Sequence, residues 1–322
     1  MLSEGMTYYG FTRDVRHVGY FETAQHQQIV AALKTAIKQG QLVALSGIVG
    51  CGKTTTLHRL QEVLGREPDI VVSQALAVDK DRVHLGTLMM ALFYDLTTEK
   101  DVTIPTQPEK RERQLLDLMH KRRKTVALFV DEAHDLHSRT LLGVKRVMEL
   151  VRASGETLAV ILAGHPKLTN DLRRPALEEI GSRATVFMLE GVKGQQRAYL
   201  TWLLEQCTTT HDADAILTSP ALTLLADRLT TPLQIEPYLT RALEEGYKIG
   251  QKPLTPELIA SVLARDLDDL EPHLTRHGYN AKALADLLNV RPAEIRAFLA
   301  GRLPPGRSQE LQQELLTAGL PL

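Results

Sequence analysis

The stretch GIVGCGKTTT, residues 47–56, decides how this chain of 322 residues folds. It matches the pattern G-x-x-x-x-G-K-[ST], in which glycines let backbone N–H groups converge on phosphate oxygens and the lysine adds a point charge. A short apolar run precedes it, and a segment with helical spacing follows it. A strand before the loop and a helix after it suit phosphate binding, because the positive end of the helix then faces the anion. We therefore predict a nucleotide-binding loop here.

This loop supplies most of the predicted nucleotide contacts. Lys53 is expected to reach the β and γ phosphates, and the Thr54 hydroxyl is expected to ligate Mg²⁺. Cys51 occupies a variable position of the pattern, and we assign it no catalytic role. The predicted cofactors are ATP and Mg²⁺. The residues expected to hold them are Gly47, Gly50, Gly52, Lys53, Thr54 and Thr55, together with Asp131 from a later segment.

The segment ALFVDEAH, residues 127–134, carries two acids beyond an apolar strand. Asp131 is expected to hold the Mg²⁺ through water, and Glu132 is suited to polarise an attacking water as a general base. The alternative is a pair of acids that only solvates the end of a strand. His134 and His137 resemble a metal-binding pair, but no cysteine or further histidine joins them in the sequence, so we predict no metal site from them.

Five strand-length apolar runs alternate with segments of helical spacing. This alternation predicts an α/β fold with a parallel five-stranded sheet and helices on both faces, in which ligands bind beyond the carboxyl ends of the strands. A polar segment with two prolines, residues 97–110, is expected to be a loop. The predicted strands occupy residues 40–47, 69–78, 125–134, 157–164 and 184–191.

The bulk composition favours a cytoplasmic protein. No apolar run approaches the roughly 20 residues that a membrane-spanning helix needs, so we expect no membrane partner. The N-terminal residues show no basic segment followed by an apolar one, so we expect no secretion signal. Cys51 and Cys207 lie far apart and suit a reducing compartment. The net charge of −1 means that any nucleic-acid binding must come from local basic patches.

His165 directly follows the fourth predicted strand, in the sequence LAGHPKL. A polar side chain at this place would lie between the phosphate loop and the acidic strand. There it would contact the γ phosphate or the attacking water, which makes His165 a candidate catalytic residue. The alternative is a histidine in a surface turn.

Arg183 directly precedes the fifth predicted strand. In oligomeric ATPases, an arginine at this place reaches into the neighbour's site and stabilises the charge of the transition state. Arg173 and Arg174 are competitors on the same segment. The alternative is an Arg183 that only pairs with a local acid, such as Glu178 or Glu179.

The order of these signals resembles the AAA+ ATPases, and the finer resemblance is to the ExeA-like group, which includes transposition ATPases of the TniB, TnsC and IstB kind. The resemblance covers roughly residues 8 to 265. It implies a homo-oligomer, either a ring or a helical filament, in which ATP binds between subunits and Arg183 acts in trans. The stretches that carry it are SGIVGCGKTTTLHRL, LFVDEAHDL, VILAGHPKLTNDLRRPALEEIGSRATVFMLEG and LTTPLQIEPYLTRALEEG.

We predict three domains. Residues 1–192 form the nucleotide-binding core, residues 193–265 a helical lid, and residues 266–322 a helical DNA-binding domain.

The lid of the family often carries an arginine shortly after a proline, as a second sensor of the nucleotide. Here Gln234 stands at that place, which predicts slow or differently coupled hydrolysis.

The segment NAKALADLLNVRPAEIRAFLAG, residues 280–301, has the spacing of a helix-turn-helix. The surrounding residues 275–307 contain six basic and two acidic side chains, after an acidic stretch that suggests a boundary near residue 270. We expect Arg291 and Arg296 to face duplex DNA. The alternative is a plain helical bundle that docks a partner protein. A second basic patch, at the end of the helical segment 111–123, has a solvated helix as its alternative. Its candidate DNA contacts are Lys121, Arg122 and Arg123.

These features favour an ATP-dependent DNA-binding regulator of transposition that assembles on target DNA and activates a separate transposase. No triad of acids for DNA strand transfer is evident, so the chain is expected to be the helper and not the recombinase. The alternatives are a secretion-associated ATPase of the ExeA type, an ATP-switched regulator of transcription, and a helicase. The helicase would need a second nucleotide-binding core.

Overall fold

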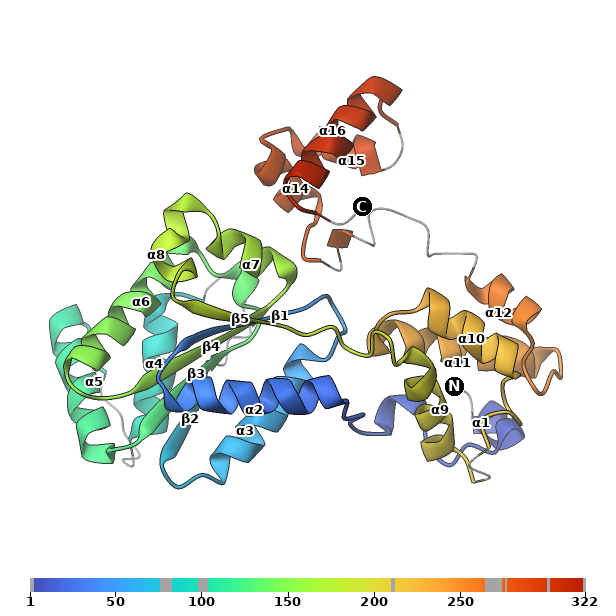
Figure 1. Ribbon diagram of the computed structural model, residues 1–322, viewed down its shortest axis with the longest axis horizontal. Helices are drawn as coiled ribbons and strands as arrows, with labels where there is room; N and C mark the ends of the chain where they lie inside the picture. The colour runs from blue at the N-terminus through green and yellow to red at the C-terminus, as the bar shows by residue number, and fades with distance from the viewer. Residues whose placement is uncertain are drawn as a thin grey trace. The chain divides into compact units, whose positions relative to one another are not determined.

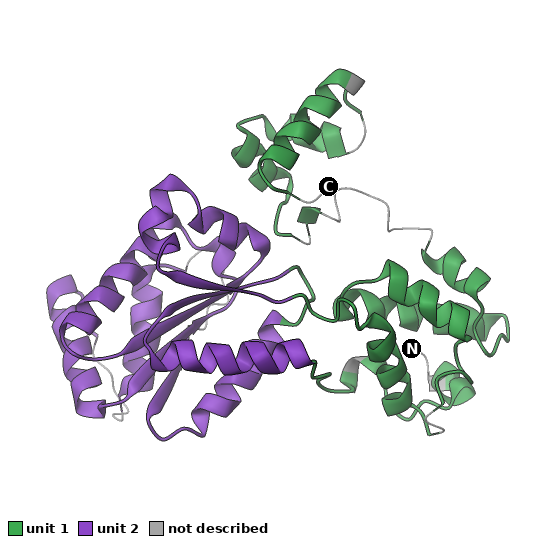
Figure 2. Ribbon diagram, in the orientation of Figure 1, with its two compact units in different colours: residues 1–23, 48–52, 190–322 green, residues 24–47, 53–189 purple. Residues whose placement is uncertain are grey.

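The computed structural model of the protein describes residues 3–75, 83–97, 104–209, 212–263, 274–275, 277–299 and 302–320 (Figure 1). The chain divides into two compact units (Figure 2). The first, which we call the sheet unit, comprises residues 24–47 and 53–189. The second, the helical unit, comprises residues 1–23, 48–52 and 190–322. The predicted boundary at residue 265 and the change of charge near residue 270 lie outside the described residues.

The sheet unit contains five parallel strands in the order β2-β3-β4-β1-β5. The prediction of a parallel five-stranded sheet is therefore confirmed. All seven residues of β4 and all five of β1 are buried, as expected for continuous apolar strands covered on both faces. β5 lies at the edge of the sheet and is largely exposed. The strands are β1 Leu42–Ser46, β2 Ile70–Gln74, β3 Thr125–Val130, β4 Leu158–Gly164 and β5 Ala184–Met188.

Helices cover both faces of this sheet (Figure 1). Alternate residues of β1, β3 and β4 pack with α4, α5 and α6 in one hydrophobic cluster. The intervening residues, such as Val43 and Leu45, are also buried, on the face along which α2 and α3 lie. The elements are α2 Ala24–Lys38, α3 Lys53–Gly65, α4 Leu85–Leu96, α5 Pro108–Arg122, η3 Ala133–Asp135, α6 Ser138–Ala153, α7 Pro166–Leu172, η4 Pro175–Leu177 and α8 Glu178–Gly181.

Two predicted elements of this unit differ in extent from the structure. β2 ends at Gln74, whereas the predicted strand ran to residue 78; residues 76–78 lie outside the described part of the chain. α5 begins at Pro108, three residues before the predicted start, because a proline is well suited to the first turn of a helix. The predicted loop 97–110 is described only in part, since residues 98–103 are among those not described.

The helical unit gathers helices from both ends of the chain. Tyr9, Phe11 and Val15 belong to the same hydrophobic cluster as α9–α12. The hydroxyl of Tyr9 donates to the carbonyl oxygen of Gln251 at 3.0 Å. The apolar side chains of this N-terminal segment thus belong to the core of the helical unit. The elements are α1 Ser3–Tyr9, η1 Val15–His17, α9 Gln196–Cys207, α10 Ser219–Arg228, α11 Pro232–Lys248 and α12 Pro256–Leu263.

The last helices form a separate hydrophobic cluster. α14 Ala281–Leu288, α15 Pro292–Leu299 and α16 Pro305–Thr317 enclose buried residues that include Leu284 and Ile295. α14 begins at Asn280, whose side-chain oxygen accepts the backbone N–H of Ala283 at 2.9 Å, a standard N-cap. Among the described helices of the whole chain, none is both long enough and apolar enough to span a bilayer.

Candidate functional site

The predicted phosphate loop connects β1 to α3. Gly47 donates its backbone N–H to the carbonyl oxygen of Gly164 at 3.2 Å, which ties the start of the loop to the end of β4. Gly50 and Gly52 have φ angles of 78° and 98°, in the left-handed region that favours glycine. A Cβ atom at Gly50 would also lie only 2.2 Å from the Cβ atom of Leu233. The backbone conformation of the loop therefore requires both glycines.

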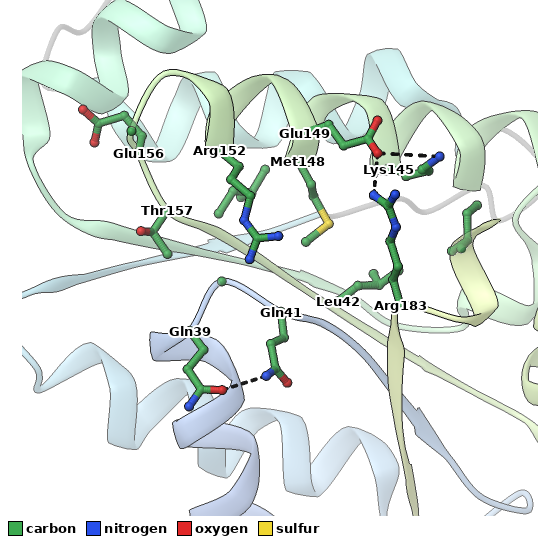
Figure 3. A pocket seen from close by; sticks show the side chains of 14 residues that line it. Gln39, Gln41, Leu42, Lys145, Met148, Glu149, Arg152, Glu156, Thr157 and Arg183 are labelled. Atoms are coloured by element: carbon green, nitrogen blue, oxygen red, sulfur yellow. Dashed lines mark hydrogen bonds and ion pairs between the residues drawn. The ribbon is translucent and has the colours of Figure 1, made fainter.

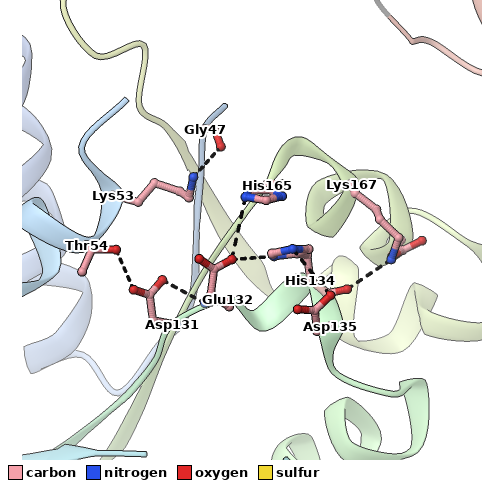
Figure 4. A network of polar contacts seen from close by, with 10 residues as sticks. Gly47, Lys53, Thr54, Asp131, Glu132, His134, Asp135, His165 and Lys167 are labelled. Atoms are coloured by element: carbon pink, nitrogen blue, oxygen red, sulfur yellow. Dashed lines mark hydrogen bonds and ion pairs between the residues drawn. The ribbon is translucent and has the colours of Figure 1, made fainter. Parts of the chain in front are cut away.

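The first turn of α3 carries the side chains predicted to bind nucleotide and metal (Figure 4). Lys53 is buried, and its Nζ donates to the carbonyl oxygen of Gly47 at 2.9 Å. The hydroxyl of Thr54 donates to Oδ2 of Asp131 at 2.7 Å, and Oδ1 of Asp131 accepts the backbone N–H of Glu132 at 2.8 Å. A hydroxyl and a carboxylate in contact are oxygen ligands of the kind that Mg²⁺ prefers. Thr54 and Asp131 therefore fit the predicted magnesium ion.

Glu132 lies next to two histidines, where β3 and β4 end. Its Oε2 atom is 3.4 Å from Nδ1 of His134 and 3.7 Å from Nε2 of His165. The two imidazole rings are stacked, with centroids 3.8 Å apart and an interplanar angle of 26°. Glu132 has a φ angle of 53°, an uncommon conformation for a residue other than glycine, which turns the chain from β3 into η3. The structure thus brings together Glu132 and His165, two of the predicted catalytic residues.

The region that contains this site is similar to a known family. Residues 36–172 match the family model described as "AAA domain". The match covers less than half of the chain, and this region is similar to an AAA domain. The matched residues include the whole phosphate loop, the two acids after β3, and His165.

One curated relative of this chain is the general secretion pathway protein A of Aeromonas hydrophila. It is 27% identical over 169 residues, a match that covers 51% of this chain and 30% of that protein. The chain therefore spans less than a third of the length of this relative.

Solved structures share the fold at low sequence identity. Cdc6p from Pyrobaculum aerophilum superposes with a TM-score of 0.55 at 16% identity, covering 98% of this chain and 85% of that chain. The ORC2 protein of Aeropyrum pernix, in its ADP form, gives a TM-score of 0.58 at 16% identity and coverages of 96% and 91%. The ORC1 protein of the same organism, in complex with DNA, gives 0.51 at 14% identity and coverages of 97% and 88%. At these identities the likeness concerns the fold alone.

Arg183 lies at the opposite end of the strands from the phosphate loop. It precedes β5, whose first residue is in register with Leu42 at the start of β1, while the loop follows the last residue of β1. The five residues of the strand separate its two ends by roughly 17 Å, at about 3.3 Å per residue. Arg183 is therefore far from the phosphate loop of its own chain.

The side chain of Arg183 pairs with an acid that the sequence did not indicate. Its Nη1 lies 2.5 Å from Oε1 of Glu149 on α6. Glu179, one of the acids expected to pair with Arg183, instead forms an ion pair with Lys145. Arg183 also lines a hollow of about 550 Å³ at this edge, beside Arg152 and Met148 (Figure 3). Of the two competing arginines, Arg174 pairs with Asp171 at 3.1 Å. Nothing in the sequence pattern pointed to Glu149, because it lies on a different helix, 34 residues away.

Gln234, at the place of the second sensor, forms hydrogen bonds with the two threonines that precede α11. Its Oε1 accepts the backbone N–H of Thr230 at 3.1 Å and the hydroxyls of Thr230 at 2.9 Å and Thr231 at 3.4 Å. Thr231 is the N-cap residue of α11, but Gln234 accepts the amide of the residue before it, so the pair is not a capping box. These hydrogen bonds give glutamine a local structural role at this position.

The two predicted DNA patches differ in how their side chains are engaged. Arg291 directly precedes α15 and Arg296 lies on it, and both are exposed. The turn between α14 and α15 passes through Asn289, which has a φ angle of 54°. In the other patch, Lys121 and Arg123 are exposed at the end of α5. Arg122 instead donates from Nε to the carbonyl oxygen of Leu96 at 2.7 Å, which satisfies the C-terminus of α4.

We predict that Gln234→Ala and Gln234→Arg both destabilise the helical unit, because neither side chain can accept the hydrogen bonds from Thr230 and Thr231. The expected loss is about 0.5–1.5 kcal/mol of unfolding free energy. Trp202, the single tryptophan, packs against the core of this unit, so its fluorescence during urea unfolding reports the change. Gln234→Glu keeps an acceptor and serves as the control. Equal stability of all three variants would contradict a structural role of these hydrogen bonds.

Proposed function

We propose that this chain is an ATP-dependent, DNA-binding ATPase that assembles on duplex DNA and regulates transposition by activating a separate transposase. The observation that carries the nucleotide part is the contact between Thr54 and Asp131 beside the buried Lys53. Lys53 would leave the carbonyl oxygen of Gly47 for the β and γ phosphates. Mg²⁺ bound near Thr54 and Asp131 would neutralise charge on the phosphates.

Glu132 is the proposed general base. Its carboxylate follows the metal-binding Asp131 directly, so a water between it and the γ phosphate would be polarised for in-line attack. His165, 3.7 Å from this carboxylate, is proposed to orient the same water or to contact the γ phosphate. Together they would hold and deprotonate the attacking water.

Arg183 is proposed to complete the site of a neighbouring subunit. Its distance from the phosphate loop of its own chain argues against action in cis. Its place at the far edge of the sheet suits a head-to-tail contact, which generates a ring or a helical filament. The ion pair with Glu149 would have to open before the guanidinium could reach a neighbour's nucleotide. In this arrangement ATP contributes to the contact between subunits, so its binding stabilises the assembly.

The DNA part of the proposal depends on the C-terminal helices. α14, the turn at Asn289 and α15 have the order and spacing of a helix-turn-helix, and Arg291 and Arg296 are exposed there. The ORC1 protein of Aeropyrum pernix, which shares the fold, was solved in complex with DNA. Transposition is favoured by the sequence resemblance carried by the stretch around AGHPKL and by Arg183. The transposase remains to be identified by its binding to the DNA-bound assembly.

A second candidate is a secretion-associated ATPase, which the similarity to general secretion pathway protein A favours. That similarity covers only 30% of the relative, so it bears on the ATPase region and not on the rest of that protein. The two candidates differ in one measurement, because only the first requires ATP-dependent assembly on duplex DNA.

We predict that Lys53→Ala abolishes both ATP binding and assembly on DNA, since the γ phosphate would lose its charge partner. Binding of a fluorescent ATP analogue and electron microscopy with duplex DNA measure the two effects, in ATP, in ADP and in a non-hydrolysable analogue. Lys193→Ala, at an exposed lysine of the helical unit, is the charge-matched control. If the Lys53 variant coats DNA normally in ATP, the nucleotide switch is disproved.

We predict that Arg183→Ala lowers the ATPase rate by about 10³–10⁵, the range measured for arginines of this kind. Glu132→Gln is also expected to be inactive while still binding ATP. Mixed in equal amounts, the two variants should recover about a quarter of the wild-type rate, because that share of head-to-tail contacts joins an intact Glu132 site to an intact Arg183. No recovery in a mixture that still assembles would contradict action in trans.

We predict that the double variant Arg291→Ala, Arg296→Ala weakens DNA binding and reduces the slope of log K against log salt by about 2, roughly one for each lost phosphate contact. The double variant Lys121→Ala, Arg123→Ala removes the same charge from the end of α5. Fluorescence anisotropy over a series of salt concentrations compares the two. A loss confined to the second variant would move the DNA site to the AAA domain.

A further inference from the structure

Glu132, His134 and His165 form a compact group of metal-binding side chains (Figure 4). One ligand atom from each residue lies within 4.8 Å of the other two. The oxygen of Glu132 is 3.4 Å from Nδ1 of His134 and 3.7 Å from Nε2 of His165. A tetrahedral zinc ion with bonds of about 2.0–2.2 Å separates its ligand atoms by about 3.4 Å. Both distances to Glu132 are thus within a few tenths of an ångström of the spacing that such an ion needs.

We propose that these three residues bind a divalent transition-metal ion of the zinc class. Two imidazole nitrogens and one carboxylate oxygen favour Zn²⁺ or Co²⁺ over Mg²⁺, which prefers oxygen ligands and near-octahedral geometry. Three protein ligands would leave a fourth position for water. The site is separate from the proposed magnesium site, whose ligands are Thr54 and Asp131.

Two contacts surround His134, one at its ring and one at its backbone. Its second nitrogen, Nε2, lies 3.5 Å from Oδ1 of Asp135, the kind of carboxylate contact that orients metal-binding histidines. Its carbonyl oxygen accepts a hydrogen bond from Nζ of Lys167 at 3.1 Å, and Lys167 is itself paired with Asp171 at 2.8 Å.

A glycine brings the two histidines together. A Cβ atom at Gly164 would lie 3.1 Å from the backbone nitrogen of His134, so the absence of a side chain lets η3 approach the end of β4. His134 and His165 then stack, and only 8% and 15% of their side-chain surfaces are exposed. His134 and His165 thus lie side by side next to Glu132, and a rotation of one ring would let Nδ1 of His134 and Nε2 of His165 face one ion.

Occupation of this site would stop hydrolysis without stopping ATP binding. The ion would engage the carboxylate of Glu132 and the ring of His165, while Lys53, Thr54 and Asp131 would stay available for Mg²⁺ and nucleotide. The metal would therefore hold the ATP-bound state. This consequence rests on the proposed function, whereas the binding of the ion does not.

The test begins with a titration of untagged, nucleotide-free protein with Co²⁺, followed by visible absorption of tetrahedral Co²⁺ and then by displacement with Zn²⁺. Competition with a chromophoric chelator gives the zinc affinity. We expect His134→Ala and His165→Ala each to weaken zinc binding by at least about tenfold, and Asp135→Asn by about 10–100-fold. His137→Ala is the matched control, since His137 is exposed in the same loop but outside the group. Circular dichroism verifies that each variant is folded.

Three results would overturn the site: no tetrahedral Co²⁺ spectrum, an unchanged affinity in the His134 and His165 variants, or an equal loss in His137→Ala. A thiolate-to-cobalt band would assign the ion to a cysteine instead. Both cysteines are buried, and burial raises the pKa of the Cys207 thiol to about 12, so this thiol stays protonated at neutral pH.

The regulatory consequence has its own readout. Zn²⁺ should inhibit the ATPase of the wild type, and His134→Ala should be at least about tenfold less sensitive, each measured relative to its own uninhibited rate. Lys53→Ala should bind zinc as the wild type does. If zinc binds but hydrolysis continues, the site stands and the proposed role of Glu132 in catalysis is wrong.

Discussion

The site depends on the fact that β1, β3 and β4 run in the same direction and end at the same edge of the sheet. The register pairs Ser46 with Gly164 and Val130 with Leu162, so the residues that follow these strands emerge side by side. The phosphate loop, the two acids and His165 come from three separate segments, with Thr54 and Asp131 77 residues apart, and they meet at the carboxyl ends of these strands. The hydrogen bond between Thr54 and Asp131 is the direct sign of that meeting, because it joins the helix after β1 to the end of β3.

The opposite edge of the same sheet has a different chemistry. Arg183 lies there with Glu149 and Lys145, beside a hollow that also includes Arg152. The parallel sheet therefore has two unlike ends, one with the phosphate loop and two acids and the other with three cations beside Glu149. The ion pair between Arg183 and Glu149 is exposed to solvent, and such pairs contribute little to stability. Opening it to meet a partner costs correspondingly little.

The sequence was sufficient for the sheet and for the residues of the phosphate loop. Buried parallel strands are continuous apolar runs, and the loop has a fixed pattern of glycines, so both are visible locally. Contacts between distant helices are not visible in this way, which is why the pairing of Arg183 with Glu149 was missed in favour of Glu178 or Glu179. The nearness of His165 to His134 is likewise not visible in the sequence, because it depends on the register of β3 and β4. The hydrogen bonds that Gln234 accepts from Thr230 and Thr231 are likewise not visible in the sequence pattern, which indicated only the absence of the second-sensor arginine. The catalytic and DNA-binding roles stay predictions.

The packing of residues 9–15 against α11 and α12 has a consequence for synthesis on the ribosome. Tyr9, Phe11 and Val15 are made more than 200 residues before α11 and α12, against which they pack. The sheet unit lies between these segments in the sequence and can close its own core first. The apolar N-terminal segment must therefore wait in an unpaired state until residue 263 has left the exit tunnel.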